Sequence, residues 1–306
     1  PLILLRVNGH LVDKEEPLHD FGFSTPHSLE EALEVMAGAR GQARALAGGT
    51  DLLVQMKRGV RQPGLVVDVK GLPELNRLDL DEGRGLLLGA AVPLDRVLEF
   101  PPLKERFGML AQACSLIGSV QIRNRASVGG NLCNAAPSAD TAPALICLGA
   151  RAIIASARGT REVLVEDFFL GPGRTVLSPD ELLVELLVPL PPSHSAGAYL
   201  RHTTRKEMDI AVAGASSFVV MEDGHCREAR IALAAVAPTP VRARGAEAFL
   251  AGKGLDDGTL AEAGERAARA ARPISDMRGS AEYRRELVKV LVVRTLRQAR
   301  EQTESA

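Results

Sequence analysis

Two glycine-bearing segments carry the residues whose types and spacing best suit the binding of a ligand. Residues 47–51 read AGGTD, and residues 127–131 read SVGGN. Glycine lets the backbone take positive φ and approach a ligand with no Cβ in the way. Successive N–H groups in such a loop can point at one anion and bind phosphate oxygens. The two segments therefore predict one long phosphate-bearing cofactor held between two loops.

Neither segment follows the patterns of the commonest nucleotide-binding loops. GxGxxG and GxxxxGK[ST] are both absent at these positions, which excludes a Rossmann fingerprint and a P-loop there. Residues 43–47 read as a short strand and residues 52–57 as a short helix. The first loop is thus expected between a strand and a helix N-terminus, where backbone donors and the helix dipole both favour an anion.

Composition narrows the class of protein and its partners. The chain has 306 residues, of which 46% are hydrophobic and 25% charged, with a net charge of −1 and no Trp. These values are typical of a globular protein and predict no nucleic-acid partner. No apolar run reaches the length of a membrane span, so no span is predicted. The opening residues lack the three regions of a signal peptide, and we expect a cytoplasmic location.

The cysteines and histidines do not suggest a metal site. Cys114, Cys133, Cys147 and Cys226 form no CxxC pair, and the six His show neither HxxxH nor HExxH spacing. We therefore expect reduced, packed thiols and no metal bound by this chain.

Local patterns predict the elements that position the two segments. A helix begins after Ser28, which caps it together with Glu31. A strand is expected at 64–69, hairpins at 78–91 and 152–165, one long helix at 104–117, a buried helix at 140–148 and a strand at 181–189. A segment rich in Pro and small residues, 189–197, predicts a boundary. Beyond it come strands at 199–204, 211–221 and 226–236, then helices at 243–251, 260–271 and 281–302. We predict domains at 1–192, with lobes of about 1–70 and 71–192, and at 193–306.

Residues 117–143, IGSVQIRNRASVGGNLCNAAPSADTAP, resemble the central motif of the FAD-binding medium subunit of the molybdenum hydroxylases. This is the group of xanthine, carbon monoxide and nicotinate dehydrogenases. Residues 47–53 resemble the first FAD loop of the family, and the order of features matches over roughly residues 20–300. The resemblance implies an α+β fold. A two-lobed FAD-binding domain of the vanillyl-alcohol oxidase type would be followed by a small domain of one sheet plus helices.

The resemblance also implies a cofactor-binding role for individual residues. A stretch wrapping the diphosphate would comprise Arg44, Ala45, Leu46, Ala47, Gly48, Gly49, Thr50 and Asp51. Its other side and the ribityl chain would be held by Ser127, Gly129, Gly130 and Asn131, with Ile117 and Cys133 near the flavin or its chain. Asp140 would contact FAD, Leu182 would pack on the adenine side, and Arg201 would replace a cofactor-contacting Lys of some relatives. Lys206 and Asp209 would lie near the ring.

Some of these residues also suit roles that involve no cofactor. Asp140 also suits a helix N-cap, Cys133 a packed thiol, and Arg201 and Lys206 solvated charges at strand ends. Two positions depart from the family pattern, because Ile117 and Ile210 stand where some relatives carry an aromatic residue. The cysteine-rich insertion of one family branch is also missing.

The function that the resemblance implies is electron transfer by an FAD-containing subunit, with no catalytic residue for substrate chemistry in this chain. A small subunit with [2Fe–2S] clusters would deliver electrons, and a large molybdopterin-binding subunit would hydroxylate the substrate. Two alternatives remain open. One is a self-sufficient flavin-dependent oxidase or dehydrogenase, and the other is a non-catalytic assembly subunit.

Overall fold

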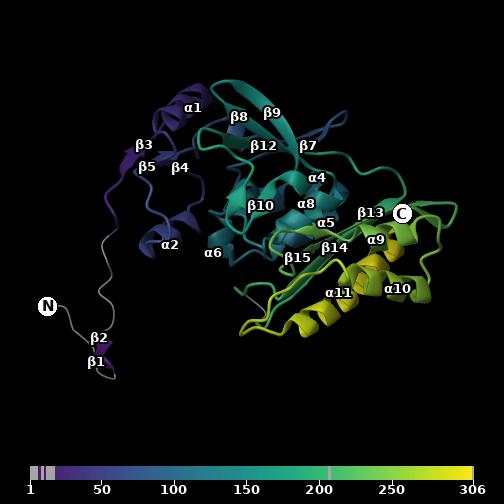
Figure 1. The fold of residues 1–306 in the computed structure, drawn as a ribbon. Coiled ribbons are helices and arrows are strands. Elements are labelled where there is room, and N and C mark those ends of the chain that lie inside the picture. Colours follow the sequence, from purple (N-terminus) through teal and green to yellow (C-terminus); the bar gives the residue numbers. More distant parts are fainter. Residues whose placement is uncertain (1–5, 8–9, 12–17, 206–207, 305–306) are drawn as a thin grey trace.

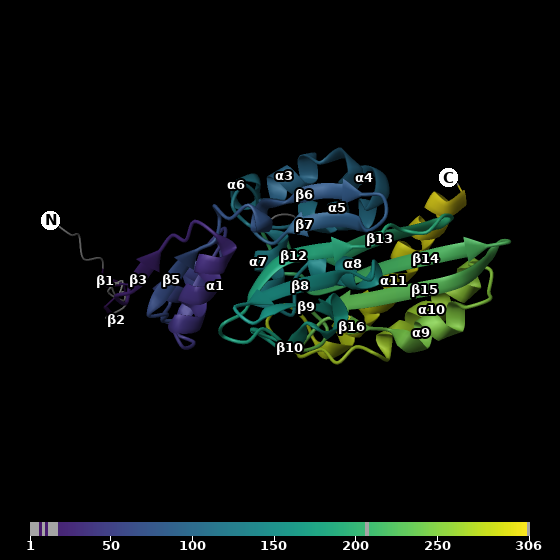
Figure 2. The ribbon, with the colours of Figure 1, turned by 90° about the horizontal axis from the view of Figure 1, so that it is seen from above.

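Three main β-sheets with their helices make up the described part of the computed structural model, residues 6–7, 10–11, 18–205 and 208–304. Lys206 lies outside the described residues. We call residues 18–70 the first lobe, 71–192 the second lobe and 193–304 the C-terminal unit. Figure 2 shows the first lobe at one end of the molecule and the C-terminal unit at the other. The boundary at residue 192 stays a prediction. A short pair, β1 (Arg6–Val7) and β2 (His10–Leu11), precedes the first lobe.

The first lobe is a small parallel α/β unit. Its sheet has the order β3 (Gly22–Ser24), β5 (Leu65–Asp68), β4 (Ala43–Leu46), and the crossovers carry α1 (Leu29–Gly38) and α2 (Leu52–Lys57). The predicted cap of α1 is confirmed, since Ser28 Oγ accepts the N–H of Glu31 at 3.1 Å. The Glu31 carboxylate accepts from the N–H of His27. Parallel strands need such crossovers. The turn between β4 and α2 therefore lies at the carboxyl end of the strands.

The second lobe is built on an antiparallel sheet, and a series of helices is inserted between two of its strands. The order is β6 (Leu78–Asp81), β7 (Gly85–Gly89), β12 (Leu182–Val188), β8 (Arg151–Ser156), β9 (Gly159–Leu164), and both predicted hairpins are confirmed. Between β7 and β8 the chain forms α3 (Leu94–Glu99), α4 (Pro101–Arg106), α5 (Gly108–Ser115), α6 (Val120–Arg123), α7 (Val128–Asn134) and α8 (Thr141–Cys147). Short elements complete the lobe: η1 (Glu74–Asn76), η2 (Val165–Asp167), β10 (Phe169–Gly171) and β11 (Arg174–Thr175).

The C-terminal unit is an antiparallel sheet buried on both faces. Its order is β13 (Ser195–His202), β14 (Ala213–Glu222), β15 (His225–Ala234), β16 (Val241–Arg242). One face packs against α9 (Arg244–Leu250), α10 (Asp257–Ala268) and α11 (Ala281–Glu304), and the other lies against α5 and α8 of the second lobe (Figures 1 and 2). Phe218 belongs to the core on the second-lobe side, whereas Val219 belongs to the core under the C-terminal helices. This alternation follows the two-residue period of a strand.

Three predicted elements need correction. The helix expected at 104–117 is two helices, because Phe107 leaves the helical region and buries its ring in the core. The strand expected at 199–204 begins already at Ser195, inside the segment that was expected to be the boundary. The second glycine segment is not a loop, since Ser127 caps α7 and both glycines lie in its first turn.

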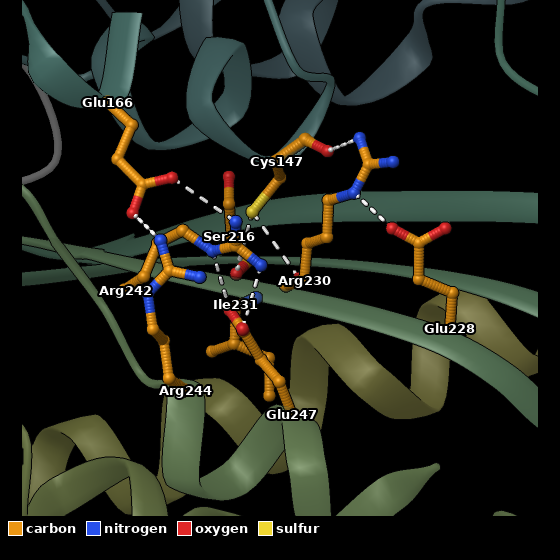
Figure 3. A network of polar contacts seen from close by, with 9 residues as sticks. All are labelled: Cys147, Glu166, Ser216, Glu228, Arg230, Ile231, Arg242, Arg244 and Glu247. Atoms are coloured by element: carbon orange, nitrogen blue, oxygen red, sulfur yellow. Dashed lines mark hydrogen bonds and ion pairs between the residues drawn. The ribbon is translucent and has the colours of Figure 1, made fainter. Parts of the chain in front are cut away.

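A network of ion pairs fastens the second lobe to the C-terminal unit (Figure 3). The Glu247 carboxylate is nearly buried and accepts from Arg242 Nε at 2.9 Å and Nη2 at 2.7 Å, and from the N–H of Ile231. Arg242 also reaches Glu166 in the second lobe at 3.2 Å, and Glu166 accepts a further bond from Arg244. Burial alone would lower the pKa of Arg242, but its bonds to Glu247 and Glu166 outweigh burial and raise that pKa.

Replacing Arg242 tests this network. Arg242→Met should lower the free energy of unfolding by about 3–5 kcal/mol, because Glu247 is left as a buried charge with no cationic partner. Arg244→Met is the matched control, since the Arg244 side chain is 66% exposed and should cost less than about 1 kcal/mol. Urea unfolding of both variants measures the difference. Equal losses in the two variants would contradict a dominant role for the Arg242–Glu247 pair.

Candidate functional site

A cavity of about 840 Å³ opens where the two lobes and the C-terminal unit meet. Pockets for small ligands and cofactors are typically of this size. Every predicted cofactor-binding residue within the described ranges lines it. These residues are Arg44, Ala45, Leu46, Ala47, Gly48, Gly49, Thr50, Asp51, Ile117, Ser127, Gly129, Gly130, Asn131, Cys133, Asp140, Leu182 and Arg201. Tertiary structure thus brings residues from four distant parts of the chain to one cavity.

The first glycine segment reaches the cavity through a close contact between backbones. A Cβ on Gly48 would lie 1.9 Å from the carbonyl oxygen of Arg125, which no side chain can tolerate. Gly49 has φ +75°, a value that L side chains rarely adopt. Gly48 therefore permits the first lobe to approach the chain just before α7, while Gly49 makes the turn. Gly48 thus serves packing between the lobes and also lines the cavity, and its predicted contact with a ligand stays a prediction.

The second glycine segment is likewise fixed by packing. A Cβ on Gly129 would lie 2.5 Å from the carbonyl oxygen of Ala90, so α7 rests directly on the chain that follows β7. Ser127 Oγ accepts the N–H of Gly130 at 3.0 Å, and Asn131 Oδ1 accepts from the Thr141 hydroxyl at 2.6 Å. These contacts hold the segment in one conformation beside the cavity.

Backbone donors remain available in the first glycine segment. The N–H groups of Gly48, Gly49 and Thr50 have no hydrogen-bond acceptor among the described residues. Buried or half-buried N–H groups need a partner, and a phosphate oxygen of a ligand would supply one. The segment thus fits the diphosphate of a dinucleotide such as FAD.

Asp140 joins the cavity wall to the C-terminal unit. Its carboxylate accepts from the Tyr199 hydroxyl at 2.6 Å and from Arg201 Nη1, and Arg201 Nη2 donates to the Leu116 carbonyl at 2.8 Å. Burial raises the pKa of Asp140, although Arg201 and the Tyr199 hydroxyl oppose that shift. Asp140 is the N-cap residue of α8, as the alternative expected, but its side chain makes no capping hydrogen bond. The alternative of a solvated Arg201 is wrong, because its side chain is 8% exposed.

Other predicted residues add apolar or neutral surface to the wall. Cys133 is half-buried and burial raises its pKa to about 12, so the thiol stays protonated at neutral pH. Ile117 and Leu182 line the cavity as aliphatic side chains. Burial also raises the pKa of Asp51. Within the described ranges no group of His, Cys, Asp and Glu is arranged to hold a metal ion.

Several lining residues were not predicted from the sequence. Gln55 and Arg61 follow the first glycine segment, Asn134 ends α7, and Gly173 sits in the β10–β11 turn. Glu181 also lines the cavity and holds the segment before β12, because it accepts from Arg161 and from the N–H of Ser178. Asn134 lies within the 117–143 motif, whereas the other four belong to no recognisable motif, and only the packing of the lobes brings them all together.

Comparison with known proteins identifies the family. A model of the FAD binding domain in molybdopterin dehydrogenase matches residues 19–191, and one of the CO dehydrogenase flavoprotein C-terminal domain matches residues 198–299. The chain belongs to the FAD-binding medium-subunit family of the molybdenum hydroxylases. It therefore has an FAD-binding domain, and the resemblance predicted from residues 117–143 is confirmed.

Individual members of the medium-subunit family match over nearly their whole length. The xanthine dehydrogenase FAD-binding subunit of Escherichia coli O157:H7 is 33% identical over 91% of this chain and 97% of its own. The carbon monoxide dehydrogenase medium chain of Hydrogenophaga pseudoflava is 32% identical over 91% and 96%. A chain of the reconstituted CO dehydrogenase from Oligotropha carboxidovorans superposes with a TM-score of 0.89 at 30% identity, covering 93% of this chain and 99% of that one. The predicted α+β fold class is confirmed.

In the described part of the chain no helix is long and apolar enough to cross a membrane.

The contact at Gly48 predicts a specific sensitivity. Gly48→Ala should lower the free energy of unfolding by about 1–3 kcal/mol, because the new methyl group forces the two lobes apart. The same displacement should weaken FAD binding. Gly38→Ala is the control, since a Cβ there meets nothing within 4 Å and alanine favours a helix. Thermal unfolding and FAD titration measure both variants. Wild-type behaviour of Gly48→Ala would contradict the close contact.

Glu181 predicts a pH-dependent contribution to stability. The bonds from Arg161 lower the pKa of Glu181, an effect that burial opposes. The stabilisation is then fully present above the ordinary Glu pKa and is lost as the pH falls through the lower pKa of the folded protein. Glu181→Gln should cost about 1 kcal/mol at pH 7 and progressively less at acid pH, as measured by urea unfolding from pH 7 to pH 3.

Glu162→Gln provides the control for that experiment. Glu162 pairs with Arg151 on the surface with its side chain 49% exposed, so its loss should change little at any pH. A Glu181→Gln deficit that stays constant down to pH 3 would contradict the Glu181 prediction.

Proposed function

We propose that this chain is the electron-transfer subunit of a molybdenum hydroxylase complex. FAD bound in the cavity would accept electrons from the [2Fe–2S] clusters of a small partner subunit, and an external acceptor would then receive them. A large molybdopterin-binding subunit would carry the substrate chemistry. The cytoplasmic location stays a prediction.

The residues of this chain bind and orient the cofactor in this proposal. The free N–H groups of Gly48, Gly49 and Thr50 would bind the diphosphate, opposite Ser127, Gly129, Gly130 and Asn131. Ile117 and Cys133 would lie along the flavin or its chain, and Leu182 on the adenine side. Lys206, predicted near the ring, stays a prediction. When bound, FAD supplies a redox centre that exchanges one or two electrons, and the protein tunes its potential and access.

The observation that favours a subunit over a self-sufficient oxidase is that most carboxylates of the cavity wall are already bonded to protein groups. Four carboxylates line the cavity in the described residues, and three of them are already bonded. Asp140 is held by Tyr199 and Arg201, and Glu181 by Arg161. Asp209 accepts from the Thr204 hydroxyl at 2.6 Å and from the Arg205 N–H at 2.8 Å. The fourth, Asp51, belongs to the first glycine segment, and no described histidine lines the cavity.

The other alternative, a non-catalytic assembly subunit, would not need a cofactor cavity. The free N–H groups and the preserved cavity favour retention of FAD.

The proposal predicts the behaviour of the native complex. Protein purified with its partner chains should show flavin and iron–sulfur absorption and should release FAD, identified by mass. After rapid mixing with the complex's substrate, iron–sulfur and flavin bands should both bleach, and the flavin should recover on adding an acceptor. The isolated chain with FAD should not oxidise the organic substrate.

Two results would count against the proposal. Substrate oxidation by the isolated chain would support a self-sufficient enzyme. A colourless complex that refuses added FAD would support an assembly subunit.

A further inference from the structure

Two arginines in the cofactor cavity have no carboxylate partner. Arg44 Nη1 donates only to the carbonyl oxygens of Gly41 and Ala43, and Arg61 donates to Gln55 Oε1 and the Gly173 carbonyl. Neither guanidinium lies within 4.0 Å of a carboxylate oxygen among the described residues. Both line the cavity and both are half-buried.

The other two arginines of the cavity wall differ from this pair. Arg201 is neutralised by Asp140, and Arg174 is exposed on β11. Arg44 and Arg61 are therefore the half-buried cationic groups of the wall that have no counter-ion within the described residues.

Arg61 is held over the cavity by a relay that crosses from one lobe to the other. Beyond α2 the chain turns back, because the N–H groups of Val60 and Arg61 both donate to the Gln55 carbonyl. Arg61 Nε then donates to Gln55 Oε1 at 2.7 Å, and Gln55 Nε2 donates to Asn134 Oδ1 at 2.8 Å. The relay thus joins α2 of the first lobe to the end of α7 and the β10–β11 turn of the second lobe. The fixed amide of Gln55 leaves Arg61 little freedom to turn away.

The two charges affect each other. Burial lowers the pKa of Arg44, and the positive charge of Arg61 lowers it further. Holding two cations together in a partly dry cleft costs free energy unless an anion joins them. A diphosphate carries two negative charges and many acceptor oxygens, and it suits the planar donor fork of arginine.

We propose that Arg44 and Arg61 form a two-arginine clamp for the diphosphate of the bound dinucleotide, with Gln55 and Asn134 as the positioning residues of Arg61. Both arginines line the same cavity as the free N–H groups of Gly48, Gly49 and Thr50. Since Arg61 also donates to Gly173 of the second lobe, the bound diphosphate would tie that lobe to the first. The inference rests on the FAD site of the proposed function and adds Arg61, which no motif indicates.

The test compares ligands with and without a diphosphate. Full-length protein, in its complex where the chain is purified that way, is stripped of cofactor and titrated with FAD, ADP and adenosine at several salt concentrations. Arg61→Gln and Arg44→Gln should each weaken FAD and ADP binding roughly tenfold to a hundredfold, the range expected for a charge-assisted hydrogen bond. Adenosine binding should not change. The salt dependence of ADP binding should decrease in both variants.

Three further variants separate the clamp from a merely structural role. Arg58→Gln removes an exposed charge at the end of α2, outside the cavity wall, and should bind all three ligands as wild type does. Arg61→Lys should retain part of the salt-dependent ADP binding, because it keeps the charge but loses the fork. Gln55→Leu should weaken ADP binding less than Arg61→Gln, since it removes only the relay.

Each outcome has a distinct meaning. Equal weakening of ADP and adenosine by Arg61→Gln would overturn the clamp, because it would show a general disturbance of the cavity. Unchanged FAD binding by Arg61→Gln would overturn it as well. Failure of the wild-type protein to bind FAD would instead refute the proposed cofactor site, and thermal unfolding of the stripped variants checks that they remain folded.

Discussion

The geometry of the cofactor cavity depends on two close contacts between backbones. At Gly48 the first lobe touches the carbonyl of Arg125, and at Gly129 α7 touches the chain after β7 at Ala90. Neither contact leaves room for a Cβ, so both glycines are required before any ligand arrives. The distance between the two glycine segments is thereby set by contacts between backbone atoms, and a close-packed interior leaves little room for either segment to shift. These two contacts therefore fix the positions from which the other residues of the cavity wall project.

Charged side chains fix the interface between the second lobe and the C-terminal unit. Asp140 is bonded to Tyr199 and Arg201 of β13, and the Arg242 and Glu247 pair reaches Glu166 of the second lobe. Buried ion pairs contribute little net stability, but they strongly disfavour arrangements that would leave one partner alone. We infer that both clusters hold the C-terminal unit in one position over the cavity, so that residues 208–211 complete its wall.

This organisation suits a subunit whose task is to hold and aim a redox cofactor. The wall offers backbone donors, aliphatic surface and cations, while its carboxylates, apart from Asp51, are bonded to neighbouring protein groups. Chemistry on an organic substrate would need a free acid or base beside the reacting atom, whereas Asp51 belongs to the segment that the family resemblance assigns to the diphosphate. Fold alone does not decide such a question, because one fold serves many reactions. The distribution of free and bonded polar groups in the cavity is the more informative observation.

The sequence by itself determined the local elements and the family. Ser28 caps α1, both hairpins of the second lobe form where predicted, and residues 117–143 identify the medium-subunit family. Such features depend on neighbours in the chain, so a linear pattern records them. Predictions from the sequence were wrong where long-range packing competes with local preference. Phe107 breaks an expected helix to bury its ring, and the second glycine segment folds into α7. Only the tertiary structure decided that Gln55, Arg61, Asn134 and Gly173 meet at the cavity, because they approach one another through the packing of lobes whose contacts leave no periodic trace in the sequence.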